Sequence, residues 1–162
     1  MTKAIYPGSF DPITLGHLDI VRRMQPLFTE LVVVVANSRR KRYLFTLEER
    51  VELIRQNLKG LDNVKIDQCD GLIVDYAKKS GAQVIVRGLR AVTDFEYEFA
   101  MAGINKKLND GIETMIAFTR PEFSFIASNM VKEVALHGGD LRGLVPDNVI
   151  QPLIKRSHEK ES

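Results

Sequence analysis

Residues 31–36 read Leu31-Val32-Val33-Val34-Val35-Ala36, an unbroken apolar run that is rich in β-branched side chains. Such side chains favour strands. A strand with one solvated face would alternate apolar and polar residues, and this run does not alternate. It therefore predicts a strand covered on both faces, as in the middle of a parallel sheet flanked by helices.

On both sides of this run, short apolar segments alternate with helical patterns. Further strands are predicted at Ala4–Tyr6, Val64–Ile66, Val84–Val86 and Thr114–Phe118. Apolar residues at helical spacing lie between them: Leu15, Leu18, Val21 and Met24; Leu47, Val51, Ile54 and Leu58; and Leu72, Tyr76 and Ala77. Thr46 and Glu49 are typical of the capping box that starts a helix. This alternation predicts an α/β fold with a doubly wound, mostly parallel five-stranded sheet, which is a Rossmann-like architecture.

The length and composition predict one domain over residues 1–162. A chain of 162 residues with 44% hydrophobic and 27% charged residues is long enough to bury a single core. No repetitive or linker-like stretch divides it. Residues 155–162 are polar and are expected to form a frayed tail.

The charge and cysteine content exclude several classes of protein. A formal net charge of +2 disfavours binding to nucleic acid, which requires clustered basic residues. The basic run Arg39-Arg40-Lys41-Arg42 is an exception and, taken alone, would be a solvated loop. The single cysteine, Cys69, allows no internal disulfide and favours a reducing compartment. Without a signal-peptide pattern or a membrane-spanning run, we expect a cytoplasmic protein with no membrane partner.

The segment after the first predicted strand is a candidate ligand site, because doubly wound sheets bind ligands beyond the carboxyl ends of their strands. Residues 6–17 read Tyr6-Pro7-Gly8-Ser9-Phe10-Asp11-Pro12-Ile13-Thr14-Leu15-Gly16-His17 and contain neither common Gly-rich phosphate loop. Gly8 would let the backbone approach a ligand. Gly16 and His17 lie at the head of the next helix, where N–H groups and the helix dipole favour an anion. His17 would then donate to a phosphate oxygen, or it would be a packed or capping residue.

A second candidate segment follows the strand predicted at Val84–Val86. Arg87 and Arg90 lie at its end, and a guanidinium matches the geometry of phosphate oxygens. The alternative for Arg87 is structural ion pairing with Asp94 or Glu96. The helix that follows is expected to have a core-facing stripe with helical spacing, formed by Phe95, Phe99 and Ala102.

The pattern Thr14-x-Gly16-His17 after a first strand resembles the signature of the nucleotidyltransferase superfamily. Residues 6–12 narrow the resemblance to the bacterial phosphopantetheine adenylyltransferase family. Two more blocks agree, Val86-Arg87-Gly88-Leu89-Arg90 with Asp94-Phe95-Glu96-Tyr97-Glu98, and Ser124-Phe125-Ile126 with Val131-Lys132-Glu133-Val134. The resemblance covers Ala4 to about Pro146. It implies an enzyme of coenzyme A biosynthesis that reversibly transfers the adenylyl group of ATP to 4′-phosphopantetheine, giving dephospho-coenzyme A and pyrophosphate.

The resemblance also implies roles for single residues. His17, Lys41 and Arg90 are implied as catalytic. The implied phosphopantetheine-binding residues are Ser9, Lys41, Ile73 and Arg87, with Leu72 beside Ile73 along the pantetheine arm. The implied ATP-binding residues are Ser9, Phe10, His17, Gly88, Leu89, Arg90, Glu98, Phe123, Ser124, Phe125, Ile126, Ala127, Ser128 and Asn129. Alternatives stay open for Leu72 and Ile73 as ordinary core residues and for Glu98 as a helix-surface carboxylate.

The chain departs from the family pattern at Ile126-Ala127-Ser128-Asn129. The family usually has Ile-Ser-Ser-Ser/Thr here, at the head of a helix that holds the β and γ phosphates, and only the middle hydroxyl is kept. Because a helix N-terminus still offers backbone donors, we expect weaker phosphate binding and not its loss.

The expected mechanism is a direct in-line attack by the acceptor phosphate on the α-phosphorus of ATP, without a covalent enzyme intermediate. The second pKa of a phosphate is about 6, so a general base is not needed at neutral pH. Positioning and charge stabilisation by His17, Lys41 and Arg90 would carry catalysis, with Mg²⁺ bound mainly through ATP phosphates. His17 would act as a donor and not as a proton shuttle. The resemblance further implies a homohexamer and coenzyme A as a feedback ligand.

Two other functions fit parts of the sequence. One is a related transferase, such as a nicotinamide mononucleotide adenylyltransferase or a glycerol phosphate cytidylyltransferase, although the block from Arg87 to Glu98 argues against both. The other is a non-catalytic ATP-binding regulatory module, which the altered residues 127–129 would favour if they reflect lost activity. Release of pyrophosphate with ATP and phosphopantetheine separates these functions.

Overall fold

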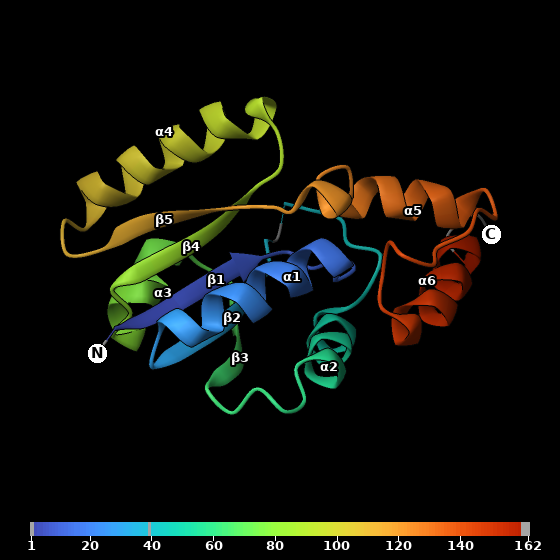
Figure 1. The fold of residues 1–162 in the computed structure, drawn as a ribbon, viewed down its shortest axis with the longest axis horizontal. Coiled ribbons are helices and arrows are strands. Elements are labelled where there is room, and N and C mark those ends of the chain that lie inside the picture. The colour runs from blue at the N-terminus through green and yellow to red at the C-terminus, as the bar shows by residue number, and fades with distance from the viewer. Residues whose placement is uncertain (1, 39, 160–162) are drawn as a thin grey trace.

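A parallel sheet of five strands forms the centre of the computed structural model, which describes residues 2–38 and 40–159 (Figure 1). The strands are β1 (Lys3–Gly8), β2 (Glu30–Ala36), β3 (Val64–Cys69), β4 (Val84–Leu89) and β5 (Glu113–Phe118). Their order is β3-β2-β1-β4-β5, and every neighbouring pair is parallel. The predicted α/β fold and its strands are confirmed, with strand ends that extend up to three residues beyond the predicted ones.

Six α-helices connect and cover the strands. They are α1 (Leu15–Met24), α2 (Leu47–Asn57), α3 (Ile73–Ser80), α4 (Val92–Leu108), α5 (Ser128–Leu136) and α6 (Asp147–Glu159), with short 3-10 helices η1 (Gln25–Leu27) and η2 (Pro121–Phe123). The predicted capping box begins α2, because the Glu49 N–H donates to Thr46 Oγ1 at 3.2 Å and the Thr46 N–H donates to Glu49 Oε2 at 2.8 Å.

The position of β2 between two cores explains why its sequence does not alternate apolar and polar residues. Leu31, Val33 and Val35 belong to the larger core, which also contains residues of α1, α2, α5 and α6. Val32 and Val34 point to the opposite core, which contains residues of α3. Both faces of the strand are therefore buried, as the unbroken apolar run predicted.

The end of the chain differs from its predicted state. Residues 155–159 form the last turn of α6 and are not a frayed tail; residues 160–162 lie outside the described residues. Ser157 is buried and its hydroxyl donates to the Leu153 carbonyl at 2.9 Å, while Arg156 pairs with Glu49 of α2. Because these residues are polar, the sequence did not indicate a helix here. Leu153 and Ser157 are four residues apart, so they lie on the same, buried side of the helix.

Helix α4 also differs from its predicted state. The stripe of Phe95, Phe99 and Ala102 was expected to face the core, but Phe95 is 50% and Phe99 70% exposed, and their rings stack on each other. Among the residues of α4 only Glu98 is fully buried. Figure 1 shows the reason: α4 runs along β4 and β5 at the edge of the sheet, and among the described helices and strands none lies over its outer face.

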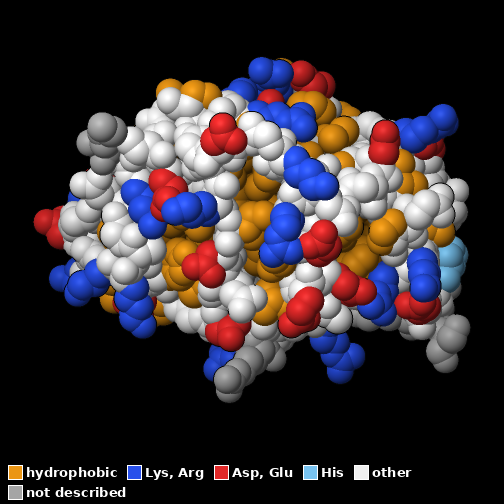
Figure 2. All heavy atoms as spheres, turned by 90° about the horizontal axis from the view of Figure 1, so that it is seen from below, with side chains coloured by type: hydrophobic (Ala, Val, Ile, Leu, Met, Phe, Trp, Pro, Cys, Tyr) orange, Lys and Arg blue, Asp and Glu red, His pale blue; other side chains and the backbone are white. Residues whose placement is uncertain are grey.

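The surface seen from the side of α2 carries basic and acidic side chains interspersed, with apolar side chains between them (Figure 2). This mixture agrees with the small net charge of the chain. Within the described part of the chain, no helix combines the length and apolar character needed to cross a bilayer.

Candidate active site

A cavity of about 530 Å³ opens beyond the carboxyl ends of β1 and β4. These two strands are neighbours in the sheet, and the chain places β2 and β3 on one side of β1 and then β4 and β5 on the other. The cavity therefore lies at the topological switch point, where such sheets bind ligands. It brings together most of the implied site residues: Ser9, Phe10, His17, Lys41, Arg87, Gly88, Arg90, Glu98, Phe123, Ile126, Ala127, Ser128 and Asn129.

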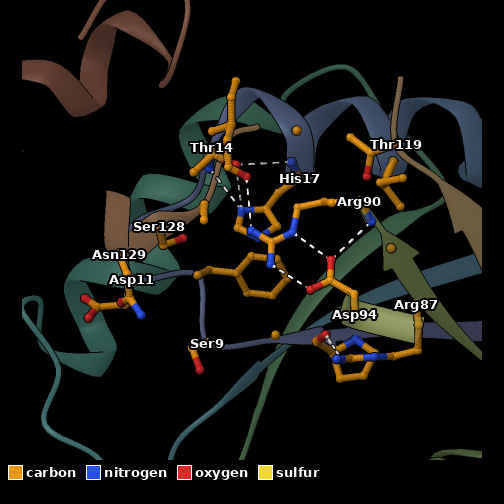
Figure 3. A pocket seen from close by; sticks show the side chains of 18 of the residues that line it. Ser9, Asp11, Thr14, His17, Arg87, Arg90, Asp94, Thr119, Ser128 and Asn129 are labelled. Atoms are coloured by element: carbon orange, nitrogen blue, oxygen red, sulfur yellow. Dashed lines mark hydrogen bonds and ion pairs between the residues drawn. The ribbon is translucent and has the colours of Figure 1, made fainter. Parts of the chain in front are cut away.

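The two ring nitrogens of His17 have different surroundings. Thr14 is the N-cap of α1, and its backbone N–H donates to His17 Nδ1 at 3.1 Å, while the His17 N–H donates to Thr14 Oγ1 at 3.3 Å (Figure 3). Because Nδ1 accepts a hydrogen bond, the proton of the neutral ring belongs on Nε2. His17 Nε2 makes no hydrogen bond to the described residues, and the ring lines the cavity. The residue is thus a capping residue and an available donor at once.

The charge state of His17 follows from its position. Burial, together with the nearby positive charges of Arg90 and Arg87, lowers the pKa of His17 to about 4. The folded protein therefore holds this ring neutral at pH 7. A neutral ring with its proton on Nε2 can donate a hydrogen bond to an anion but has no extra proton to transfer.

Gly8 lines the cavity, where its backbone is expected to approach a ligand, and it has a second purpose. A Cβ at this position would lie 2.9 Å from the tip of the Phe10 ring. Phe10 is buried with a φ of 47°, and its ring meets that of His17 edge to face at 5.0 Å. Gly8 therefore makes room for Phe10, whose ring packs against His17.

Arg87 is paired with Glu98, and not with Asp94 or Glu96, the two partners considered from the sequence. Its Nε and Nη2 donate to the two Glu98 oxygens at 2.7 Å each, and Nη1 donates to the Pro7 carbonyl at 2.9 Å. Burial alone would lower the pKa of Arg87, but the Glu98 carboxylate outweighs it and raises the pKa. Glu98 is 7% exposed, so it is no surface carboxylate. Since a guanidinium has five N–H groups, Arg87 keeps donors for a phosphate.

Arg90 is held by Asp94 of α4. Its Nε and Nη2 donate to the two Asp94 oxygens at 3.1 and 3.2 Å, and Figure 3 shows this pair beside His17. Burial alone would raise the pKa of Asp94, but the hydrogen bonds and charge of Arg90 lower it. Arg90 Nη1 also donates to the Ile126 carbonyl at 3.4 Å, which connects the end of β4 to the start of α5.

The start of α5 shows what the unusual residues 127–129 do. Ala127 occupies the N-cap and offers no side-chain hydrogen bond to the helix. The Ser128 hydroxyl donates to the Pro12 carbonyl at 2.9 Å, so its proton is engaged within the protein. Asn129 is exposed at the cavity wall. The donors that remain for an anion here are the backbone N–H groups of the first helical turn and the Asn129 amide.

A second cavity of about 240 Å³ adjoins the first and shares Pro7, Arg87 and Glu98 with it. It is mainly apolar and lies between α3 and α4, with Leu72 and Ile73 on its wall. Leu72 is 60% exposed, so the alternative of an ordinary core position is wrong for it, whereas Ile73 also packs against the smaller core.

Three implied residues line neither cavity: Leu89, Ser124 and Phe125. Leu89 is buried, Phe125 is exposed, and the Ser124 hydroxyl donates to the Pro121 carbonyl at 2.9 Å. Of the basic run, Lys41 and Arg42 line the larger cavity, while Arg39 lies outside the described residues.

Sequence reasoning missed Asp11 and Lys132, which also line the cavity. The Asp11 carboxylate accepts the N–H groups of Leu44 and Phe45 at 2.9 Å each, and Lys132 Nζ donates to it at 3.2 Å. One side chain thereby connects the loop after β1, the loop after β2 and helix α5. Both residues belong to sequence blocks that resemble the family, but no pattern in the neighbouring sequence indicated that they pair with each other. Tyr43 and Thr119 also line the cavity and were missed.

Known proteins resemble this chain in sequence and in fold. Residues 5–134 match the cytidylyltransferase-like family. The phosphopantetheine adenylyltransferase of Bdellovibrio bacteriovorus is 56% identical over 150 residues, which cover 93% of this chain and 94% of that protein. The one from Carboxydothermus hydrogenoformans is 55% identical over 149 residues, 92% of each chain. Plasmodium falciparum nicotinic acid mononucleotide adenylyltransferase, solved in complex with NaAD, shares the fold, with a TM-score of 0.69, 18% identity and 95% coverage of both chains.

Proposed function

The chain belongs to the phosphopantetheine adenylyltransferase family of cytidylyltransferase-like nucleotidyltransferases, and from this membership we propose how its cavity works. The enzyme transfers the adenylyl group of ATP to 4′-phosphopantetheine in coenzyme A biosynthesis. In our proposal an oxygen of the acceptor phosphate attacks the α-phosphorus in line. The bond from the α-phosphorus to the bridging oxygen breaks, and pyrophosphate leaves with the bonding electrons.

The observation that carries this mechanism is the neutral His17 ring, with Nδ1 engaged by Thr14 and Nε2 free to donate. A donor aimed at the cavity stabilises charge that develops on the phosphoryl oxygens. The acceptor phosphate brings its own negative charge, so no residue has to remove a proton from it. Lys41 and Arg90 are proposed to stabilise the same charge from other sides of the cavity.

The acceptor is proposed to bind across both cavities. Its phosphate would lie near Ser9, Lys41 and the remaining donors of Arg87, and its pantetheine arm would lie along Leu72 and Ile73 in the apolar cavity. Arg87 lines both cavities, so it stands where the charged end and the apolar arm of such a ligand would meet. Burial of the arm supplies affinity in proportion to the apolar area removed from water.

ATP is proposed to bind between the loop after β1, the end of β4 and the start of α5. This uses Ser9, Phe10, His17, the segment Gly88–Arg90, Glu98 and residues 123–129. Leu89, Ser124 and Phe125 could contribute only through backbone or at the rim, because their side chains line neither cavity.

A divalent metal fits this cavity as a companion of the nucleotide, and we propose that it is Mg²⁺. The carboxylates that line the cavity, Asp11, Asp94 and Glu98, are paired with Lys132, Arg90 and Arg87 respectively. Phosphate oxygens would therefore supply most of its ligands. When bound, the ion would neutralise charge on the triphosphate.

The function is tested by measuring pyrophosphate release with ATP and several phosphate-bearing acceptors. We expect turnover with 4′-phosphopantetheine and at most traces with nicotinamide mononucleotide or glycerol phosphate. ATP binding without turnover on any acceptor would instead identify a regulatory module.

We also propose that the enzyme assembles as a homohexamer. The support is the exposed apolar face of α4 and β5, defined by Val92, Phe95, Phe99 and Phe118. Ile104 and Leu108, also exposed, lie on another side of α4 and line the second cavity. Apolar surface gathered on one face in this way marks an interaction site, and a second copy of the chain is the proposed occupant.

A further inference from the structure

Arg50 is a buried cation for which the proposed reaction has no use. It lies on α2 and is 1% exposed. Among residues 2–38 and 40–159, no carboxylate lies within ion-pair distance of it, although the charges of Asp11 and Glu48 act on it from farther away, and its Nε has no hydrogen-bond partner there. Burying an unpaired charge is costly, so an arginine here needs a role that an apolar side chain could not fill.

The guanidinium of Arg50 joins segments that follow different strands. Its Nη1 donates to the Ser9 carbonyl, after β1, at 2.9 Å and to the Ala36 carbonyl, at the end of β2, at 3.2 Å. Its Nη2 donates to Asn37 Oδ1 at 2.7 Å. A planar fork can reach acceptors in several directions at once, which a lysine ammonium on a flexible stem does less well.

Arg50 also supports the far end of the basic loop, defined here as residues 37, 38 and 40–43. The Tyr43 ring lies over the guanidinium, with 4.0 Å between the ring centroid and Cζ, a distance typical of a cation–π contact. Tyr43 Oη in turn accepts the Ser38 N–H at 2.8 Å, and the Lys41 N–H donates to the Ser38 carbonyl at 3.1 Å. The loop that carries Lys41 is therefore fixed at its start and at its end through one side chain.

We infer that Arg50 is a positioning residue for the acceptor: its guanidinium holds Ser9 and the basic loop in the arrangement that presents Lys41 to the cavity. The inference rests on the proposed binding of the acceptor phosphate by Ser9 and Lys41. Arg50 itself does not touch the substrate. Its effect should fall mainly on the acceptor, because the acceptor phosphate is proposed to use both Ser9 and Lys41. Of the proposed ATP contacts only Ser9 is bonded to Arg50, and the start of α5 is not.

The test compares Arg50→Lys with Arg55→Lys, an exposed arginine on the same helix, as the matched control. We expect Arg50→Lys to raise KM for 4′-phosphopantetheine at least about tenfold and to leave ATP affinity within about threefold. The control should change neither value. Equal losses of ATP and acceptor binding, or an unchanged acceptor KM, would overturn the inference.

A second readout is independent of the reaction. Brief trypsin digestion of the native proteins, mapped by mass spectrometry, measures cleavage after Arg40, Lys41 and Arg42. Cleavage there should be several times faster in Arg50→Lys than in the parent and in Arg55→Lys. If the parent enzyme failed to use phosphopantetheine, the proposed function would be wrong while this comparison still tested whether Arg50 holds the loop.

Tyr43→Leu tests the same inference in case the Arg50 variant does not fold. It removes the ring above the guanidinium and the hydroxyl that accepts the Ser38 N–H, but it leaves the three Arg50 donor contacts in place. The same selective rise in acceptor KM and the same faster cleavage are expected, to a smaller extent. A Tyr43→Leu enzyme with parental values for both would show that the loop does not depend on this support.

Discussion

At the scale of single residues, the donor at His17 Nε2 is the sharpest test of the mechanism. His17→Ala is expected to lower kcat at least about a hundredfold and to leave ATP affinity within a few-fold, because a donor aimed at transition-state charge contributes roughly 2.7–4 kcal/mol there. Steady-state kinetics and ATP titration measure the two effects. Thermal unfolding is the control, since the ring also caps α1 through Thr14. Equal losses in kcat and ATP affinity would make His17 a simple binding residue.

The lowered pKa of His17, about 4, predicts the pH dependence of the reaction. The ring stays neutral from pH 8 down to about pH 5, so it gives no inflection in that range. The rate should instead fall as the pH drops through about 6, where the acceptor phosphate takes up a proton. His17→Gln, which keeps a neutral N–H donor, should show the same inflection at a lower plateau. Loss of that inflection in His17→Gln would identify His17 as the titrating group.

Arg87 is expected to contribute to acceptor binding and to the stability of α4 separately. Arg87→Ala should weaken phosphopantetheine at least about tenfold and ATP much less, because a charge-assisted contact to phosphate is lost. It should also lower Tm, since the Glu98 carboxylate is left buried without its partner. The double variant Arg87→Ala/Glu98→Gln should recover Tm but not acceptor affinity. Calorimetry that found ATP weakened and the acceptor unaffected would reverse the assignments of Arg87 and Arg90.

At the scale of elements, helix α5 begins without a side-chain cap, at Ala127. Ala127→Ser should cap the helix and stabilise the protein by about 0.5–2 kcal/mol, which raises Tm by a few degrees. If the hydroxyl also reaches the triphosphate, ATP binding should tighten about three- to tenfold with kcat nearly unchanged. Asn129→Ser, inside the first turn, should do less on both measures. A higher Tm with unaltered ATP affinity would show that the missing hydroxyl concerns the helix alone.

Local patterns predicted the five strands and helices α1 to α4, because strand and helix periods and the Thr46 capping box depend on residues close in sequence. They did not predict α6. The pattern of α4 showed an apolar stripe but not what covers it, which is why Phe95 and Phe99 were misplaced. Local patterns could not predict which side chains pair with each other in the site. Asp11 and Lys132 are 121 positions apart, and the Ser9 carbonyl is 41 positions from Arg50, so only the folded sheet brings them together.

At the scale of the whole molecule, the exposed face of α4 and β5 predicts the assembly. Phe99→Glu should convert a sixfold assembly into smaller species, because a buried carboxylate without a partner is costly at an interface. Sedimentation velocity measures the change. Leu27→Glu, at an exposed apolar residue of η1, is the control and should keep the parental mass. A Phe99→Glu enzyme of unchanged mass would place any interface elsewhere.

The division of the site into two adjoining cavities has an evolutionary consequence. The proposed nucleotide side is built from the loop after β1, the end of β4 and the start of α5, whereas the proposed acceptor cavity lies between α3 and α4. On this proposal, mutations at Leu72 or Ile73 change which acceptor is accepted while the phosphate chemistry is inherited intact. Leu72 is mostly exposed in the single chain, so changes at Leu72 cost the core little, whereas Ile73 also packs against the smaller core. Acceptor specificity can in this way evolve while the residues around the ATP phosphates stay unchanged.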